Sequence, residues 1–96
     1  MSNEELHKRF VKAFEVANQM DIDIPIDLRL QYYAYYKQAT DDDGTYKPND
    51  PIEIRNAFKM NAILQVKNLS QDEAKLKYIE LVNQTIIKYN LKLNLV

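Results

Sequence analysis

Helix-breaking residues are scarce in this chain of 96 residues, which holds one glycine and three prolines. Pro25, Gly44, Pro48 and Pro51 lie between segments in which apolar side chains recur at helical spacing. Glycine and proline mark turns and loops, so the segments between them are free to form long helices. The pattern predicts an all-α fold in which four helices form a bundle. The length suits one domain, which we expect to span residues 1–96.

The first and fourth helices have the clearest start signals. Ser2 with Glu5, and Ser70 with Glu73, have the capping-box spacing, in which each side chain bonds a backbone N–H that the helix leaves unpaired. Leu69 precedes the second box as a hydrophobic staple. The faces expected to be buried hold Leu6, Phe10, Ala13, Phe14, Ala17 and Met20 in the first helix, and Ala74, Tyr78, Leu81, Val82 and Tyr89 in the fourth, which Asn90 is expected to end.

Two further helices are expected on either side of a longer loop. The second begins at Pro25 or Ile26, since proline is tolerated in a first helical turn, and runs to Ala39. Residues 21–25 form the connection before it, and the acidic run, the glycine and two prolines make residues 40–51 a loop. The third helix is expected over residues 52–67, with apolar positions Ile54, Ala57, Phe58, Ala62, Leu64 and Val66.

The composition excludes several classes of protein. Hydrophobic residues make up 46% and charged residues 28% of the chain, which is too apolar for a disordered protein. The net charge is −1, so a strongly basic nucleic-acid binder is not indicated. The N-terminal residues are charged and no apolar run reaches about 18 residues, so neither a signal peptide nor a membrane span is predicted. We expect a soluble cytoplasmic protein.

Catalytic and metal chemistry find little support in the residue types present. The chain has no cysteine, which excludes disulfides, thiolate nucleophiles and Cys-based zinc sites. Its one histidine, His7, is read as a solvated surface residue. The acidic run at residues 41–43 lacks EF-hand spacing, because Asp50 stands where the loop needs Glu. A single glycine cannot form a glycine-rich phosphate loop. We expect no catalysis, metal or cofactor.

Charge and tyrosine are concentrated in particular segments. Residues 21–53 carry eight acids and three bases, whereas residues 54–96 carry seven bases and three acids, so the second half could bind an anionic small molecule. Tyr33, Tyr36 and Lys37 have the i, i+3, i+4 spacing that places side chains on one helical face. Two phenols and an ammonium suit phosphate oxygens. Packing of these tyrosines in the core is the open alternative.

Residues 33–40 read Tyr-Ala-Tyr-Tyr-Lys-Gln-Ala-Thr, which resembles the Tyr-x-x-Tyr-Lys-Gln-Ala-Thr signature of the acyl-CoA-binding protein family. The resemblance extends without gaps from about Phe10 to Tyr89. Further matches to the family pattern are Lys59, Ala62, residues 70–74 at the start of the fourth helix and residues 77–79. The Lys47-Pro48 pair lies in the loop where the family tends to have Arg-Pro, displaced by one residue.

The resemblance implies an up-down-down-up four-helix fold that binds medium- or long-chain fatty acyl-CoA without covalent chemistry. By the same resemblance, Tyr33, Lys37 and Lys59 hold the ribose 3′-phosphate, Tyr36 bonds the phosphate region and Tyr78 lies against adenine. We expect a monomer that transports acyl-CoA in the cell, supplies acyl-CoA-using enzymes and does not insert stably into membranes. The other candidates for lining the ligand are Phe14, Asn18, Leu30, Ala34, Tyr35 and Met60.

The sequence departs from the family pattern at a few positions that bear on binding. Met60 and Ile63 stand where the family has tryptophans, and Ala34 replaces a glycine. Asn18 aligns with a lysine that many members carry near the phosphates, so one cationic contact is missing or supplied elsewhere. These departures leave one alternative, a four-helix module of the same fold that has lost its ligand and binds a protein partner.

Overall fold

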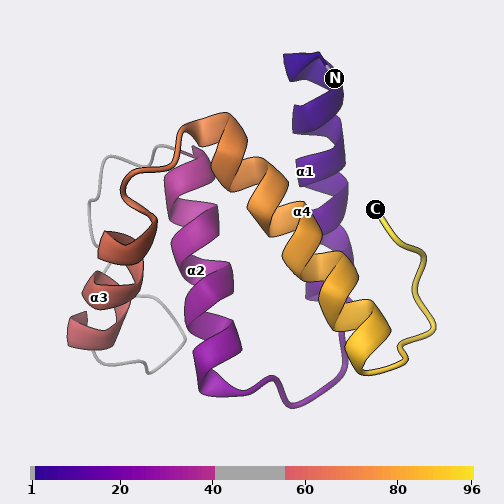
Figure 1. Ribbon diagram of the computed structural model, residues 1–96. Helices are drawn as coiled ribbons and strands as arrows, with labels where there is room; N and C mark the ends of the chain where they lie inside the picture. Colours follow the sequence, from indigo (N-terminus) through magenta and orange to yellow (C-terminus); the bar gives the residue numbers. More distant parts are fainter. Residues whose placement is uncertain (1, 41–55) are drawn as a thin grey trace.

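The computed structural model describes residues 2–40 and 56–96, with side chains from residue 58 onward in the second range. Within these ranges the chain forms four α-helices and no strand, as expected (Figure 1). The helices are α1 (Asn3–Asn18), α2 (Ile26–Thr40), α3 (Asn56–Val66) and α4 (Gln71–Lys88). None of these described helices is both long and apolar enough to cross a membrane.

The helices follow the up-down-down-up order that the sequence resemblance implied. In Figure 1, α1 and α4 run downward, whereas α2 and α3 run upward. The extensive packing joins α2 to α3, α2 to α4 and α1 to α4. The helix α2 therefore has one side against the core formed with α4 and another side against α3, and α3 lies at the edge of the bundle (Figure 1).

The core lies mainly between α1 and α4. Leu6, Phe10 and Ala13 of α1 are buried, as their spacing predicted, and Phe14, Ala17 and Met20 pack against the core while partly exposed. From α4 the buried side chains are those of Ala74, Tyr78, Ile79, Leu81, Val82, Thr85 and Ile86. This set confirms four of the five predicted positions, and Tyr89 is only half-buried.

The ends of α1 and α4 are fixed by the residues expected there. The Ser2 hydroxyl accepts a hydrogen bond from the Glu5 N–H at 3.2 Å, and Ser70 with Glu73 forms both bonds of a capping box. After α4, Asn90 takes a left-handed conformation with φ 52°, which asparagine tolerates better than most residues. The N–H groups of Asn90 and Leu91 then bond the Ile87 and Ile86 carbonyls at 3.2 and 3.0 Å, completing a Schellman motif.

The C-terminal residues fold back onto α1 and α4. The Val96 N–H donates to Asn83 Oδ1 at 2.7 Å, and Arg9 Nη2 donates to the Val96 carbonyl at 3.1 Å. Leu91, Leu93 and Val96 pack against the core while partly exposed. This tail extends the apolar packing of the bundle beyond its last helix.

The third helix differs most from its prediction. It was expected over residues 52–67 and its described part is Asn56–Val66, in which Phe58 and Leu64 are 51% and 59% exposed instead of buried. The reason is that, among the described helices, α3 packs extensively against α2 alone, so these helices cover only a narrow strip of its surface. That strip contains Val66 and, unexpectedly, Lys59. The predictions for residues 41–55, including the acidic run, Gly44, the Lys47-Pro48 pair and Ile54, and for the Ala57 side chain lie outside the described residues.

Candidate anion-binding site

Two lysines from different helices meet at the ring of Tyr33. Lys37 lies one turn further along α2, and its Nζ is 5.8 Å from the centre of the Tyr33 ring. Lys59 comes from α3, and its Nζ is 5.1 Å from the same ring centre. The structure thus brings together three of the residues to which the resemblance gave one role. Two ammonium groups beside a phenol form a cationic surface that suits a compact anion.

The Lys59 side chain is nearly enclosed, with only 3% of the residue exposed. A buried ammonium is costly unless other groups compensate its charge. The Tyr33 ring supplies part of that compensation, since a cation near an aromatic face gains about 0.5–2 kcal/mol. Burial also removes most of the freedom of a long side chain, so Lys59 is held in place before any ligand arrives.

A side-chain clamp fixes α3 relative to α2. Gln38 Nε2 donates to the Leu69 carbonyl at 2.6 Å, and the Lys67 carbonyl lies 3.3 Å away. Both carbonyls belong to the turn between α3 and α4, which lies beside the C-terminal end of α2 (Figure 1). Gln38 directly follows Lys37 in α2. These hydrogen bonds therefore fix the position of α3 along the axis of α2, near the contact between Lys59 and Tyr33.

Tyr36 turns toward α1 and joins an aromatic group there. Its ring stacks on Phe14 with centres 5.0 Å apart and planes at 27°, and on Phe10 with centres 6.0 Å apart. Phe14 and Tyr36 are both half-buried, so part of this stacked pair remains accessible. The predicted contact of Tyr36 with the phosphate region stays a prediction.

Tyr78 is buried in the core of the bundle. It is 4% exposed, and its ring meets Phe10 and Tyr32 edge to face at 5.2 and 5.4 Å. Burial raises the pKa of Tyr78 above its usual range, and the nearby Tyr32 and Tyr36 hydroxyls raise it further. In this structure Tyr78 packs the core between α1, α2 and α4, and its predicted contact with adenine stays a prediction.

A half-buried hydroxyl pair between α2 and α4 was not predicted. The hydroxyls of Tyr32 and Thr85 are 2.7 Å apart, and Thr85 donates to the Leu81 carbonyl at 2.7 Å. Burial raises the pKa of Tyr32, and the hydrogen bond with Thr85 opposes part of that rise. The seven-residue spacing from Tyr78 to Thr85 was a signal for the buried side of α4.

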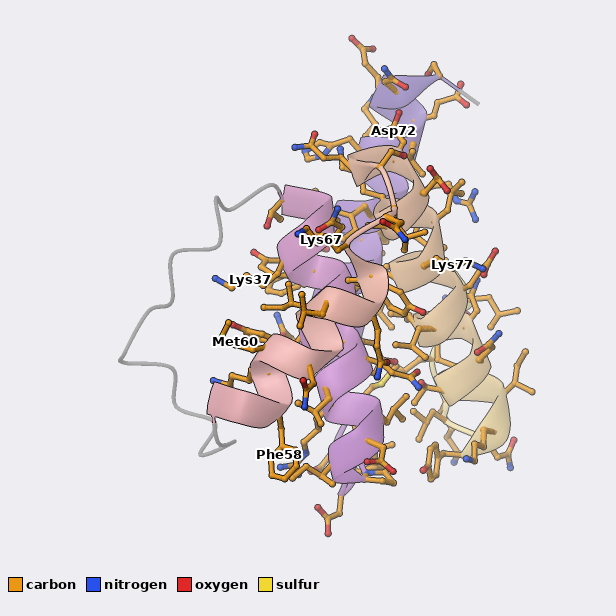
Figure 2. All side chains as sticks on the ribbon, turned by 60° about the vertical axis from the view of Figure 1, so that its left-hand side comes forward. Lys37, Phe58, Met60, Lys67, Asp72 and Lys77 are labelled. Atoms are coloured by element: carbon orange, nitrogen blue, oxygen red, sulfur yellow. The ribbon has the colours of Figure 1, made fainter. Side chains whose placement is uncertain are left out.

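The remaining candidates lie in different surroundings. Phe14, Leu30 and Tyr35 are half-buried, Ala34 is buried, and Asn18 is exposed at the end of α1. Met60 is 63% exposed on α3. Figure 2 shows Lys37 and Met60 projecting toward the same edge of the molecule, with Phe58 at the far end of α3.

One cation was missed on the same face of α2. Arg29 lies one turn before Tyr33, and its Nη2 is 3.1 Å from Asp23 Oδ1. The four-residue spacing of Arg29, Tyr33 and Lys37 in the sequence was the signal that could have found it. No group of three or more His, Cys, Asp or Glu residues that could hold a metal ion occurs within residues 2–40 and 56–96.

The chain is thus a small four-helix protein in which lysines from two helices lie beside one tyrosine ring. The protein family described as "Acyl CoA binding protein" matches residues 7–82. Among curated proteins, the acyl-CoA-binding protein of Saccharomyces cerevisiae is 32% identical over 81 residues, which cover 84% of this chain and 93% of that protein. The acyl-CoA-binding protein of Dictyostelium discoideum is 35% identical over 63 residues, covering 66% of this chain and 75% of that protein. The chain belongs to the acyl-CoA-binding protein family.

A third relative is the acyl-CoA-binding protein homolog 1 of Caenorhabditis elegans, which is 33% identical over 63 residues, covering 66% of this chain and 73% of that protein. No solved structure matches the chain significantly. The family assignment confirms the resemblance that residues 33–40 indicated.

Proposed function

We propose that this protein binds medium- and long-chain fatty acyl-CoA thioesters without covalent chemistry, sequesters them and transports them within the cell. The observation that carries the proposal is the convergence of Lys37 and Lys59 on Tyr33. The names of the relatives in yeast, Dictyostelium and the nematode support the same ligand. The alternative of a protein-interaction module without a ligand is less favoured, because these two lysines already converge beside a phenol.

In this proposal the ribose 3′-phosphate of the ligand binds between Lys37 and Lys59. That phosphate is a compact dianion, and two ammonium groups neutralise it while the Tyr33 hydroxyl orients one of its oxygens. Lys59 is already immobilised by burial, so it loses little further freedom on binding. Tyr36 would bond the phosphate region, and Tyr78 would lie against adenine after a local rearrangement of the core.

The acyl chain needs apolar surface beyond the nucleotide. Phe14, Leu30 and Met60 are the candidates, and the exposed Met60 side chain has apolar area left to cover a chain. Asn18, Ala34 and Tyr35 would line the ligand between its two ends. Each buried CH₂ of the chain adds about 0.8 kcal/mol, so affinity should rise with chain length until the apolar surface available to the chain is covered.

The mechanism is binding without turnover. Catalysis of thioester hydrolysis needs a nucleophile activated by a base, and His7, the only histidine of the sequence, is exposed on the first turns of α1. We propose a cytoplasmic monomer without a cofactor, whose partners are acyl-CoA and the enzymes that use it.

Calorimetric titration tests the proposed function. Palmitoyl-CoA is compared with free CoA and with palmitate, and saturated thioesters from C8 to C16 follow. Submicromolar binding of palmitoyl-CoA, with both halves far weaker, is the expected result. Absence of palmitoyl-CoA binding would overturn the proposal and favour the protein-interaction module, whereas equal affinity for all chain lengths would overturn only the proposed apolar contacts of the acyl chain.

A further inference from the structure

Arg29 continues the row of side chains that begins with Lys37 and Tyr33. The three residues stand at intervals of four on α2, so they follow one another along one side of the helix with a small sideways drift. At a rise of about 1.5 Å per residue, Arg29 and Lys37 are separated by roughly 12 Å along the helix axis, with Tyr33 between them. A ligand that lies along this row meets positive charge at two places along the helix axis, at Arg29 and at Lys37.

The present partner of Arg29 holds it only weakly. Arg29 bonds one oxygen of Asp23 at 3.1 Å, and the two side chains are 43% and 99% exposed. Ion pairs this exposed contribute little stability, because water solvates both groups well. The guanidinium is therefore held beside the face of α2 and can exchange its carboxylate for a stronger anion at little cost.

The ligand of the proposed function has two anionic centres, the 3′-phosphate and the diphosphate. Lys37 and Lys59 both lie at Tyr33, so they serve one centre. The aligned helix-one position holds the uncharged Asn18, which cannot neutralise the other. A guanidinium presents several N–H donors in one plane and matches phosphate oxygens in pairs.

We propose that Arg29 leaves Asp23 when acyl-CoA binds and holds the diphosphate of the ligand. This inference rests on the proposed function, and it places the diphosphate nearer the N-terminal end of α2 than the 3′-phosphate. Asp23 then acts as a competitor for Arg29. It lowers affinity slightly, because binding must first break this weak ion pair.

The test separates the two anionic centres chemically. Palmitoyl-CoA and 3′-dephospho-palmitoyl-CoA, which keeps the diphosphate, are titrated into the wild type, Arg29→Gln and Lys37→Gln. Arg29→Gln should weaken binding of both ligands by the same factor, roughly five- to twentyfold for a lost charge-assisted contact at an exposed site. Lys37→Gln should weaken palmitoyl-CoA strongly and the dephospho ligand little. Asp23→Asn should strengthen both by about two- to threefold.

Lys77→Gln is the matched control. It also removes one positive charge from an exposed side chain in a weak ion pair, with Lys77 Nζ 3.6 Å from Glu80 on α4. Figure 2 shows Lys77 on the side of the molecule away from Lys37, so this variant measures the effect of net charge alone. Arg29→Lys should recover part of the affinity, and thermal unfolding should show all variants folded.

Three results have distinct meanings. If Arg29→Gln binds both ligands as tightly as Lys77→Gln does, Arg29 does not contact the ligand and the inference is wrong. If Arg29→Gln weakens binding of palmitoyl-CoA but not of 3′-dephospho-palmitoyl-CoA, Arg29 acts at the 3′-phosphate and the diphosphate assignment is wrong. If the wild type binds palmitoyl-CoA no better than palmitate, the proposed function fails first.

Discussion

Tyr33 offers its surroundings two separable groups, a ring and a hydroxyl. The ring lies beside Lys37 and Lys59, and it helps to compensate the charge of the buried Lys59. The hydroxyl is a donor for a phosphate oxygen in the proposed function. Substitutions that remove one group and keep the other can therefore divide the site into its parts.

We predict that Tyr33→Phe weakens palmitoyl-CoA binding by roughly 0.5–1.5 kcal/mol, because it removes one hydrogen bond and keeps the ring. Lys37→Ala should cost more than Lys37→Arg, because arginine keeps the positive charge and the donors. Calorimetric titration of the three variants checks the order. Equal affinity for all three would show that the phosphate is held elsewhere.

The site could be predicted from sequence only where its residues share a helix. Tyr33 and Lys37 follow from four-residue spacing, which fixes side-chain neighbours on any α-helix. No spacing rule links Lys59 to Tyr33, because their contact depends on how α3 packs on α2. Lys59 was assigned by family resemblance, and neither the resemblance nor the residue spacing predicted that it is buried. Arg29 was within reach of the spacing rule and was overlooked.

At the level of the elements, α1 and α4 were predicted well and α3 poorly. The first two have one apolar face and strong capping residues, so periodicity and end signals agree. The apolar residues of α3 surround the helix, so their pattern does not say which side is covered. Phe58 and Leu64 are accordingly exposed although their type favours burial. The helix order was implied by the family resemblance, since periodicity does not determine connectivity.

The capping box of α4 gives a prediction at the same level. Ser70→Ala removes the oxygen that accepts from the Glu73 N–H at 3.0 Å, and it should lower the free energy of unfolding by about 1 kcal/mol. Urea unfolding followed by circular dichroism measures the loss. Gln71→Ala, exposed beside the cap, leaves both capping bonds in place and is the control. An equal loss in the two variants would show that the cap contributes nothing specific.

Across the whole molecule, α2 joins the core to the candidate site. Its side toward α4 carries Tyr32, whose hydroxyl bonds Thr85, and another side, toward α3, carries Tyr33 beside Lys59. Because Tyr32 and Tyr78 are partly or fully buried in the core, the stability of the fold depends on their protonation.

Alkaline pH should destabilise this fold through Tyr78 and Tyr32. Burial raises the pKa of both above the ordinary value of 10.0, so both stay neutral in the folded state at pH values where the unfolded chain begins to ionise. Below about pH 9 these tyrosines are protonated in both states and contribute no pH dependence. Above about pH 10 the unfolded state loses protons that the folded state keeps, so the free energy of unfolding falls.

The free energy of unfolding should fall by about 1.4 kcal/mol per pH unit for each tyrosine that is neutral in the folded state and ionised in the unfolded state. Urea unfolding at a series of pH values from 8 to 11 measures this fall. In Tyr78→Phe the slope of the free energy of unfolding against pH should be smaller by roughly 1.4 kcal/mol per pH unit, the contribution of one tyrosine. Tyr89→Phe, which removes the hydroxyl of a half-buried tyrosine after α4, is the matched control. A Tyr78→Phe profile parallel to that of the wild type would show that Tyr78 ionises as readily in the folded chain as in the unfolded one. Tyr78 would then be accessible to solvent in the folded chain.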